Sequence, residues 1–343
     1  MFFCTNTKIV PLKNRIYLFI LALLTIILLL ADIAIGSVWI PLDEVIVILS
    51  GNEPTKLAWQ TIIWDFRMPR VLSAILVGGA LAVSGLLMQT LFRNPIAGPY
   101  VLGISSGASL GVAILLMSGG LSLMSGFGQW AMVIVAALGS GLVLLLMMLI
   151  AWRVRDIVTL LIVGLMLGSA TSAIVTILEY FSGLQQLKMF VLWSFGSLNR
   201  ITWDEFYVLF LIVGLGLFGS FFITKPLNAL LIGEEYAKSM GLQIMPIRFF
   251  IIGITALLAG SVTAFCGPIA FIGIATPHLA RMLFQTQNHQ ILLPATILFG
   301  IVIMLFCDLI AQLPGSDQNL PINAVTSLIG APVVIWIVVK RKY

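Results

Sequence analysis

The sequence predicts an all-α, polytopic membrane protein with about ten transmembrane helices. Of its 343 residues, 60% are hydrophobic and only 9% are charged, whereas soluble globular domains carry roughly 25% charged residues. Runs of about 20 mainly apolar residues, the length that crosses a bilayer, recur along the whole chain. So few charges cannot cover a water-facing domain, and they leave no basic surface for nucleic acid. We therefore expect a single transmembrane domain over residues 1–343, embedded in a lipid bilayer.

Ten segments have the length and apolar composition of a membrane span, or nearly so. The first follows Lys8, Lys13 and Arg15, and its apolar core of about 20 residues exceeds the roughly 7–15 residues of a signal peptide. We interpret it as a retained span. The eighth is the least regular, because Pro268 and Pro277 interrupt it. In chain order, the expected spans are residues 16–36, 71–91, 100–118, 130–151, 157–180, 206–223, 248–266, 268–284, 290–311 and 322–339.

The basic residues predict the orientation of these spans, because Lys and Arg stay on the cytoplasmic side. With ten spans and an inside N-terminus, thirteen of the eighteen basic residues fall inside. We therefore expect both termini in the cytoplasm and the protein in the cell membrane (the inner or plasma membrane). The five basic residues expected outside are Lys56, Arg67, Arg70, Lys188 and Arg200.

Two arginines flank Pro69 at the outer end of the second span. Arg67 and Arg70 are three residues apart, and proline suits the first turn of a helix. A helix that begins at Arg67 would place both guanidinium groups near one face at the membrane surface. Paired arginines can grip the carboxylates of an extracytoplasmic partner. Anchoring to lipid phosphate is the other interpretation, and the residues alone do not decide between the two.

The second span ends in a segment that cannot remain helical. Pro95, Gly98 and Pro99 lie within five residues. Irregular backbone at membrane depth is tolerated only where it is buried in protein or lines a cavity. This segment, which includes Asn94 and Ile96, is therefore a candidate constriction or gate.

The fifth span carries Ser169, Ser172 and Thr176 on one helical face, at positions i, i+3 and i+7. Weakly polar, uncharged side chains suit the path of a large solute that must pass without binding tightly. Hydroxyls that bond back to their own helix explain the same pattern. No carboxylate occupies the middle of any expected span, so a proton relay has no residue to use. This disfavours a proton-coupled secondary transporter.

The largest cytoplasmic connection is predicted to form two short helices separated by Gly233. Glu234 and Glu235 would occupy the first turn of the second helix, and Gly241 suits its C-terminal cap. A structured inner loop is typical of a docking surface for a cytoplasmic partner, whereas a solvated connector would not need such caps.

No residue pattern predicts catalysis, a metal site or a cofactor. The three cysteines, Cys4, Cys266 and Cys307, have no C-x-x-C spacing, and the last two lie in apolar runs where we expect them to be buried. His278 and His289 are too few for a histidine-based metal site. The sequence has no G-x-x-x-x-G-K-S/T phosphate-binding loop. We therefore expect that the chain is not an enzyme and that any ATP is bound by another subunit.

Several stretches together resemble the iron-siderophore, haem and cobalamin family of ABC importer permeases. They occur in the family's order over about residues 60–340, and the family's subunits have ten spans, in agreement with the count above. The matching stretches are Arg67-Met-Pro-Arg70-Val-Leu through Gly78-Gly-Ala-Leu-Ala, Gln89-Thr-Leu-Phe-Arg-Asn94-Pro95, Leu102-Gly-Ile-Ser-Ser-Gly107-Ala, Gly233-Glu234 to Gly241, Cys266-Gly-Pro-Ile-Ala-Phe-Ile-Gly273 to Pro277-His278, Leu320-Pro321 and Leu328-Ile-Gly330-Ala-Pro332.

The resemblance implies a homodimer with the translocation path at the subunit interface. It also implies two cytoplasmic ATPase subunits and an extracytoplasmic substrate-binding protein. Arg67 and Arg70 match the family's arginines that meet glutamates of the binding protein, which favours the docking interpretation. Some members carry a third docking arginine after the ninth span, where this sequence has Gln312. Docking would then use fewer charge pairs.

The resemblance also implies roles for residues on the cytoplasmic side. Asn94 and Ile96 fall on an inner gate, and Ile157 and Val158 fall on a second gate element. The short helices of the inner loop match those that seat in the ATPase. The residues expected to couple to that partner are Gly233, Glu234, Ala237 and Gly241.

From these features we expect the permease subunit of an ATP-binding-cassette importer that moves a metal chelate into the cytoplasm. A ferric siderophore is the expected chelate. Haem and cobalamin are alternatives, because the family's pores are lined by small generic side chains that do not identify the solute. A secondary transporter or channel is the alternative from a different class. It would need a mid-membrane carboxylate or a selectivity ring, and the sequence shows neither.

Overall fold

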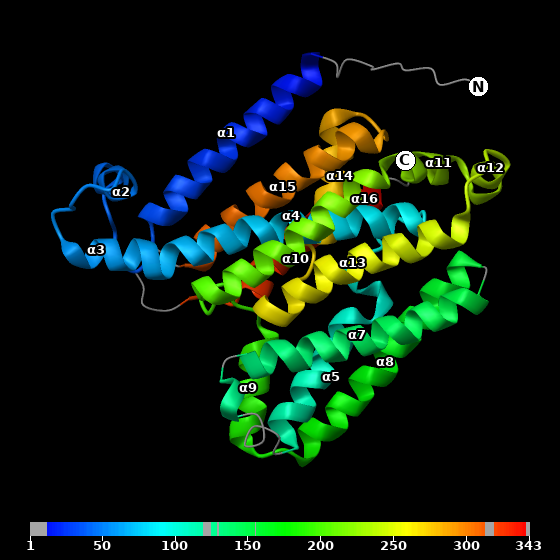
Figure 1. Cartoon of the computed structure of the whole chain (residues 1–343), viewed down its shortest axis with the longest axis horizontal. Helices are drawn as coiled ribbons and strands as arrows, with labels where there is room; N and C mark the ends of the chain where they lie inside the picture. The colour runs from blue at the N-terminus through cyan, green and yellow to red at the C-terminus, as the bar shows by residue number, and fades with distance from the viewer. Residues whose placement is uncertain (1–11, 119–124, 129, 155, 313–318, 341–343) are drawn as a thin grey trace.

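The protein folds into two packed groups of helices (Figure 1). Every regular element in the part of the chain described below is helical, which confirms the predicted all-α class. Cys4 and Lys8 lie outside the described residues, as do both chain ends. The structure, a computed structural model, describes residues 12–118, 125–128, 130–154, 156–312 and 319–340.

Each of the ten expected spans contains a helix. These helices are α1 (Leu12–Ala34), α4 (Met68–Leu91), α5 (Ile104–Met117), α7 (Trp130–Arg153), α8 (Ile157–Phe181), α10 (Trp203–Phe222), α13 (Ile244–Cys266), α14 (Ile272–Phe284), α15 (His289–Ala311) and α16 (Ile322–Lys340). Seven helical segments of the described residues are long and apolar enough to cross a membrane by length and composition. The other three are shorter: α5 and α14 have 14 and 13 residues, and the described apolar stretch of α16 is Ile322–Trp336.

In the described residues, the connections contain five further α-helices. α2 (Leu42–Leu49) and α3 (Leu57–Thr61) occupy the first outer connection, and α9 (Leu184–Ser194) occupies another. These three were not predicted, because a search for runs of about 20 apolar residues passes over such short helices. The inner loop forms α11 (Thr224–Ile232) and α12 (Glu234–Ser239), as predicted.

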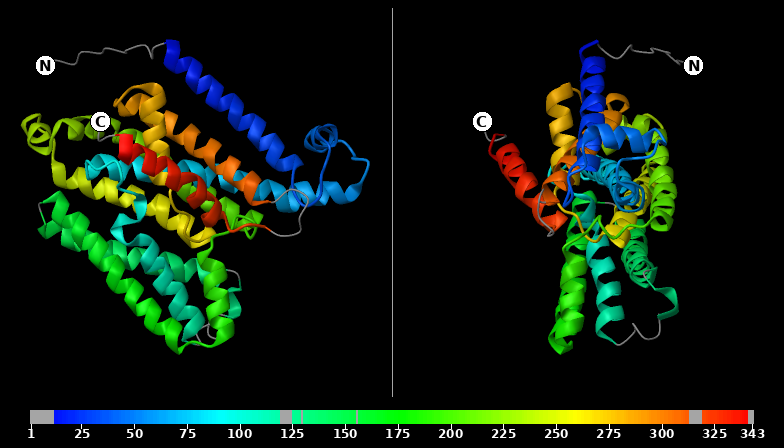
Figure 2. Two further views of the ribbon diagram at one scale, coloured as in Figure 1. Left: turned by 180° about the vertical axis from the view of Figure 1, so that it is seen from behind. Right: turned by 90° about the vertical axis from the view of Figure 1, so that its left-hand side faces the viewer.

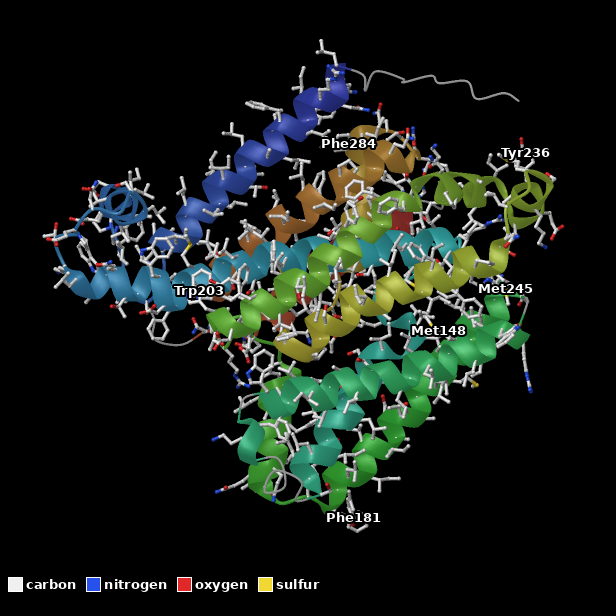
Figure 3. All side chains as sticks on the ribbon, viewed as in Figure 1. Met148, Phe181, Trp203, Tyr236, Met245 and Phe284 are labelled. Carbon is white, nitrogen blue, oxygen red and sulfur yellow. The ribbon has the colours of Figure 1, made fainter. Side chains whose placement is uncertain are left out.

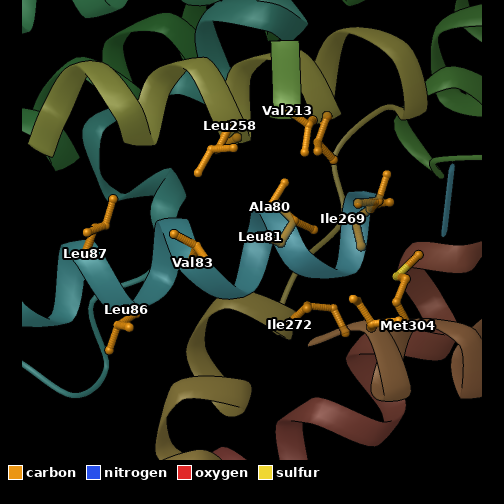
Figure 4. Close-up of a cluster of buried hydrophobic side chains, with 14 of the residues drawn as sticks. Ala80, Leu81, Val83, Leu86, Leu87, Val213, Leu258, Ile269, Ile272 and Met304 are labelled. Carbon is orange, nitrogen blue, oxygen red and sulfur yellow. The ribbon is translucent and has the colours of Figure 1, made fainter. Parts of the chain in front are cut away.

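α4 is the central helix of the larger group. Most of its residues are buried, because α10, α13, α14 and α15 all pack against it. Figure 4 shows Ala80, Leu81 and Leu87 of α4 in a cluster with Val213 of α10 and Met304 of α15. A helix that is apolar on all sides is typical of such an enclosed position. The other helices of this group are therefore positioned by their contacts with α4.

Glycines bring two helices into direct backbone contact with α4. A β-carbon at Gly85 would lie 1.7 Å from the carbonyl oxygen of Gly273 in α14. A β-carbon at Gly78 would lie 2.4 Å from the carbonyl oxygen of Gly300 in α15. No side chain fits at either place. In lipid, where hydrophobicity does not drive helices together, such close packing is a main source of helix association.

α5, α7, α8 and α9 form the smaller group, which lies in the lower part of Figures 1 and 2. Its apolar core is separate from the core around α4 and includes Val112, Ala136 and Trp193. Here too glycines allow close approach, because a β-carbon at Gly107 of α5 would lie 2.5 Å from the carbonyl oxygen of Gly139 in α7. α13 contacts helices of both groups and so joins them.

Long apolar faces remain exposed on α1, α7, α8 and α10. Met166 and Phe181 of α8 are 68% and 80% exposed, and Phe218 of α10 is 64% exposed. Surfaces of this size are stable only in lipid or against another subunit. The start of α1 and the end of α16 lie toward the same end of the helices as α11 and α12 (Figure 2).

Gly85→Ala is expected to lower the free energy of unfolding by at least about 1–3 kcal/mol, the usual range for overpacking an interior. The added methyl group would overlap the backbone of Gly273. Gly214→Ala in α10 is the matched control, because nothing lies within 4 Å of its β-carbon position and alanine favours a helix by up to about 1 kcal/mol. Thermal unfolding in detergent measures both. Equal stability of Gly85→Ala and the unsubstituted protein would contradict the backbone contact.

Candidate functional site

α4 is preceded by a π-helical turn, Ile62–Arg67, and that turn by α3. We call this end of α4, which the sequence predicts to be extracytoplasmic, its outer end. In the π pattern, Pro69 lacks the N–H that would bond to the Trp64 carbonyl oxygen. The indole N–H of Trp203, at the start of α10, donates to that oxygen instead, at 2.8 Å (Trp203 is labelled in Figure 3). The helical segment therefore does not begin at Arg67. π turns of this kind are frequent at functional sites.

The Arg67 guanidinium is buried against the outer end of α1. Arg67 is only 6% exposed. Its side chain donates hydrogen bonds to the carbonyl oxygens of Ile33, Ala34 (at 3.0 Å) and Val38. Carbonyl groups at a helix C-terminus lack partners within the helix, and a cation is favoured there. Arg67 therefore fixes the end of α1 to the segment that leads into α4.

Arg70 forms an ion pair with Asp308 of α15. The Arg70 Nε lies 2.9 Å from the Asp308 Oδ2, and the two side chains are 12% and 3% exposed. Beside them, the buried Gln312 amide donates to the Asp32 carboxylate of α1. Asp32 and Asp308 thus place two buried carboxyl groups beside the two arginines. This outer cluster joins α1, α4 and α15.

A cavity of about 330 Å³ adjoins the outer cluster, lined in part by Arg67, Arg70 and Gln312 with the exposed Asn199 and Asn319. The sequence correctly placed the two arginines together. Both guanidinium groups are turned inward, because each bonds to oxygen atoms of its own chain. Gln312 supplies a hydrogen bond to the cluster and no charge. The docking role of the arginines stays a prediction.

The chain leaves α4 through a left-handed residue, Arg93. Its φ is +47°, a conformation that costs a residue with a β-carbon about 1–2 kcal/mol. The N–H of Asn94 bonds to the Gln89 carbonyl oxygen, and the N–H of Arg93 bonds to that of Thr90. These paired bonds form a Schellman cap, in which glycine is the usual residue at the left-handed position.

Asn94 and Ile96 lie in irregular backbone after this cap, as predicted. The Asn94 Oδ1 accepts a hydrogen bond from the Ile96 N–H at 3.0 Å, and Ile96 is 45% exposed. Ile96 also lines an apolar cavity of about 300 Å³ with Leu165 of α8 and Phe271. Phe271, at φ +67°, lies in the break between α13 and α14. Two non-helical segments therefore meet at a cavity, which is where lipid permits them.

Ile157 and Val158 form the first turn of α8, at the same end of the molecule as the break after α4 (Figure 1). Asp156 caps this helix by accepting hydrogen bonds from the Thr159 hydroxyl and backbone N–H, at 2.6 and 2.7 Å. These bonds hold the pKa of the Asp156 carboxyl below its usual range. Val158 is 56% exposed. The second candidate gate element is thus a well-capped helix start with a half-buried Ile157 and an exposed Val158.

The inner loop has the caps that the sequence predicts. Gly233, with φ +147°, separates α11 from α12, and Glu234 begins α12. At the other end of α12, Gly241 has φ +84° and the Leu242 N–H bonds to the Ala237 carbonyl oxygen, which completes a Schellman cap. Ala237 is fully buried, so α12 packs firmly on the body of the protein.

Arg248 ties α12 to two other helices. The Arg248 Nη2 lies 2.9 Å from the Glu234 Oε1, and its Nη1 donates to the Val154 carbonyl oxygen at 3.2 Å. Arg248 lies near the start of α13 and is only 2% exposed. Val154 directly follows α7, three residues before Ile157. One buried cation therefore links the inner loop to the start of α8.

A second link joins the inner loop to α4 and α15. The His289 Nδ1 lies 2.8 Å from the Asn228 Oδ1 of α11, and its Nε2 lies 2.9 Å from the Thr90 Oγ1 of α4. His289 is fully buried at the start of α15. This contact was not predictable from the sequence, because the three residues are far apart in the chain and form no spacing pattern.

Ser169, Ser172 and Thr176 are all exposed on α8, and their role in lining a path stays a prediction. The Ser169 hydroxyl donates to the Leu165 carbonyl oxygen at 3.0 Å, and the Thr176 hydroxyl donates to the Ser172 carbonyl oxygen at 3.1 Å. Bonding back to the helix therefore accounts for two of the three hydroxyl groups. The face itself has no cover within the single chain.

Titratable side chains of the described residues do not gather as metal ligands. The described part of the chain contains no group of three or more His, Cys, Asp or Glu side chains that could hold a metal ion. Cys266 and Cys307 are free thiols and are buried, which confirms their predicted apolar surroundings.

Comparison with known proteins identifies a family. The model of the FecCD transport family matches residues 23–340. The vitamin B12 import system permease protein BtuC of Klebsiella pneumoniae is 35% identical over 332 residues, which cover 96% of this chain and 95% of that protein. BtuC of Salmonella paratyphi A is 33% identical over 330 residues, 96% of each chain. A solved ABC transporter assigned to the metal-chelate type, in an inward-facing conformation, matches with a TM-score of 0.84 and 30% identity over 95% of this chain and 99% of that one.

Arg70→Met is expected to lower the free energy of unfolding by about 3–5 kcal/mol, because it leaves Asp308 buried without its cation. Adding Asp308→Leu should recover at least about 1 kcal/mol of this loss. Arg200→Met is the control, because Arg200 is exposed on the same side and its loss should change stability by no more than about 0.5 kcal/mol. Chemical denaturation in micelles measures all three. Additive losses in the double variant would show that the pair is not coupled.

Proposed function

The chain belongs to the FecCD transport family, and we propose that it is the permease subunit of an ATP-driven importer of a metal chelate. The inner loop carries the proposal: α11 and α12 are capped helices that buried polar side chains join to α4, α13 and α15. Cobalamin is the first candidate chelate, because relatives at 33–35% identity are named for vitamin B12 import. A ferric siderophore, the expectation from sequence, is the second, and haem is the third.

On the cytoplasmic side, two ATPase subunits would each act on an inner loop. Ile232, Tyr236 and Met240 of this loop are 65%, 52% and 59% exposed, whereas Ala237 is fully buried. Exposed apolar and aromatic side chains on a firmly packed support are typical of a protein interface. ATP hydrolysis would then take place in the separate subunits and not in this chain.

On the outer side, a substrate-binding protein would dock over the cavity beside the outer cluster. The Arg67 and Arg70 guanidinium groups already have partners within the chain, so carboxylates of the binding protein would share Arg70 with Asp308. The exposed amides of Asn199 and Asn319 offer further hydrogen bonds at the cavity.

A second copy of the chain would cover the exposed face of α8 and enclose a path between the two subunits. Only 17% of the membrane window of α8 is buried in the single chain, so this helix has little cover of its own. Ser169, Ser172 and Thr176 would line the path, with Ile96 and Val158 at its inner end. Their hydroxyls and modest size would let a large chelate pass without strong binding.

A secondary transporter or channel is the competing function. Asp32 and Asp308 are the buried carboxylates of α1 and α15, and both lie near the outer ends of these helices. Asp308 is held by Arg70, and Asp32 by Gln312. Neither carboxylate is placed at mid-membrane to carry a proton or bind an ion, which favours ATP as the energy source.

Uptake into proteoliposomes tests the proposed function. The chain is reconstituted with a candidate ATPase subunit and a candidate binding protein from the same organism, and labelled cobalamin or ferric siderophore is supplied outside. We expect uptake that requires ATP and all three components. Uptake of the siderophore but not of cobalamin would identify the siderophore as the chelate. Uptake driven by a proton gradient without the ATPase would contradict the importer assignment.

Glu234→Arg is expected to reduce ATP-driven uptake by at least about tenfold, because it places a like charge beside the buried Arg248 and breaks the tie to α8. Like charges at such a contact cost several kcal/mol. The exchanged pair, Glu234→Arg with Arg248→Glu, is the matched control and should recover part of the uptake. Unchanged uptake in the single variant would remove the inner loop from the coupling role.

A further inference from the structure

We propose that Arg93 is a positioning residue that ties the inner gate segment to α11, so that movement of the inner loop is passed to Asn94 and Ile96. This inference rests on the proposed function and names a contact through which the loop would act. It concerns one hydrogen bond, between the guanidinium of Arg93 and the last turn of α11.

The backbone at Arg93 favours glycine, and yet a long basic side chain stands there. With φ +47°, Arg93 occupies the left-handed position of the cap that ends α4. Glycine adopts this conformation without strain and is common in such caps. A strained residue persists where the surrounding structure holds it, often because its side chain has a function.

The Arg93 side chain contacts the inner loop at two points. Its Nη2 donates to the Leu230 carbonyl oxygen at 3.1 Å. That oxygen lies in the last turn of α11, where carbonyl groups have no partner within the helix and a cation is favoured. The same Nη2 lies 3.2 Å from the position that a β-carbon of Gly233 would take. The guanidinium therefore lies against the junction of α11 and α12.

Few atoms separate the gate segment from α11 through Arg93. Arg93 directly precedes Asn94, whose side chain holds the turn to Ile96. A hydrogen bond from a charged donor is stronger than one between neutral groups, so a displacement of α11 would move the gate segment with it. Arg248 connects the inner loop to the segment just before α8. The two arginines would thus serve different gate elements.

Arg93→Gly tests the tie, because it relaxes the backbone while it deletes the guanidinium. Gln285→Gly is the matched control. Gln285 is also left-handed, at φ +48°, at the end of α14. It is exposed, and its side chain makes no hydrogen bond among the described residues. Both variants should unfold at or above the temperature of the unsubstituted protein.

In the complete transporter, Arg93→Gly should still allow ATP hydrolysis but move at least about tenfold less chelate per ATP, a change that corresponds to about 1.4 kcal/mol. Gln285→Gly should match the unsubstituted transporter. Arg93→Lys should retain most of the coupling, because its ammonium can also donate to the Leu230 carbonyl oxygen. Arg93→Met should not. The Lys and Met pair decides the question if the glycine variant does not fold.

Equal chelate per ATP in Arg93→Gly and the unsubstituted transporter would overturn the inference, as would equal losses in Arg93→Gly and Gln285→Gly. Hydrogen exchange in the purified chain alone reads the contact without transport. Arg93→Gly should speed amide exchange in α11 and at Gly233, and Gln285→Gly should not. Unchanged exchange would overturn the tie. If exchange in α11 is faster in Arg93→Gly, as expected, but the unsubstituted transporter shows no ATP-driven uptake, the proposed function is overturned and the tie is not.

Discussion

The backbone contact of α4 with α14 and α15 is the constraint on which the rest of the structure depends. At Gly85, for example, the carbonyl group of Gly273 occupies the space that a side chain would need. Together with α10 and α13, which also pack on α4, these two helices enclose it and fix it within the larger group. Its outer end then presents Arg67 and Arg70 to α1 and α15, and its inner end presents Arg93 to α11. One buried helix therefore sets the positions of both candidate sites.

The few charged side chains act as ties between helix ends. At the outer end, Arg70 pairs with Asp308 and so joins α4 to α15. At the inner end, Arg248 pairs with Glu234 and also contacts the segment before α8. α8 itself packs mainly on α5 and is largely uncovered. The result is a rigid group around α4 beside a less enclosed α8, whose start is connected to the inner loop. On the proposed function, α8 is the helix that moves.

The features that depend on residue patterns within short stretches of chain were predictable from the sequence. Hydropathy located the spans, and glycine and acidic residues located the caps of the inner loop, because both signals are contained in short stretches of chain. Features that depend on distant segments were not predictable. Arg67 is buried because α1 ends beside it and presents free carbonyl groups. His289 contacts Thr90 and Asn228 only in the folded chain. The strain at Arg93 follows from how α4 ends, and the residue type alone gives no sign of it.

Distances between spin labels test the rigid group and the moving helix most directly. In the assembled transporter, one sample carries a label at Ser172 of α8 in each subunit. A second sample carries labels at Leu215 of α10 and Phe306 of α15, which are 60% and 45% exposed. Pulsed electron spin resonance compares the nucleotide-free and ATP-bound states. The architecture predicts a changed distance between the two α8 helices and an unchanged distance between α10 and α15. A change between α10 and α15, with the α8 distance constant, would contradict it.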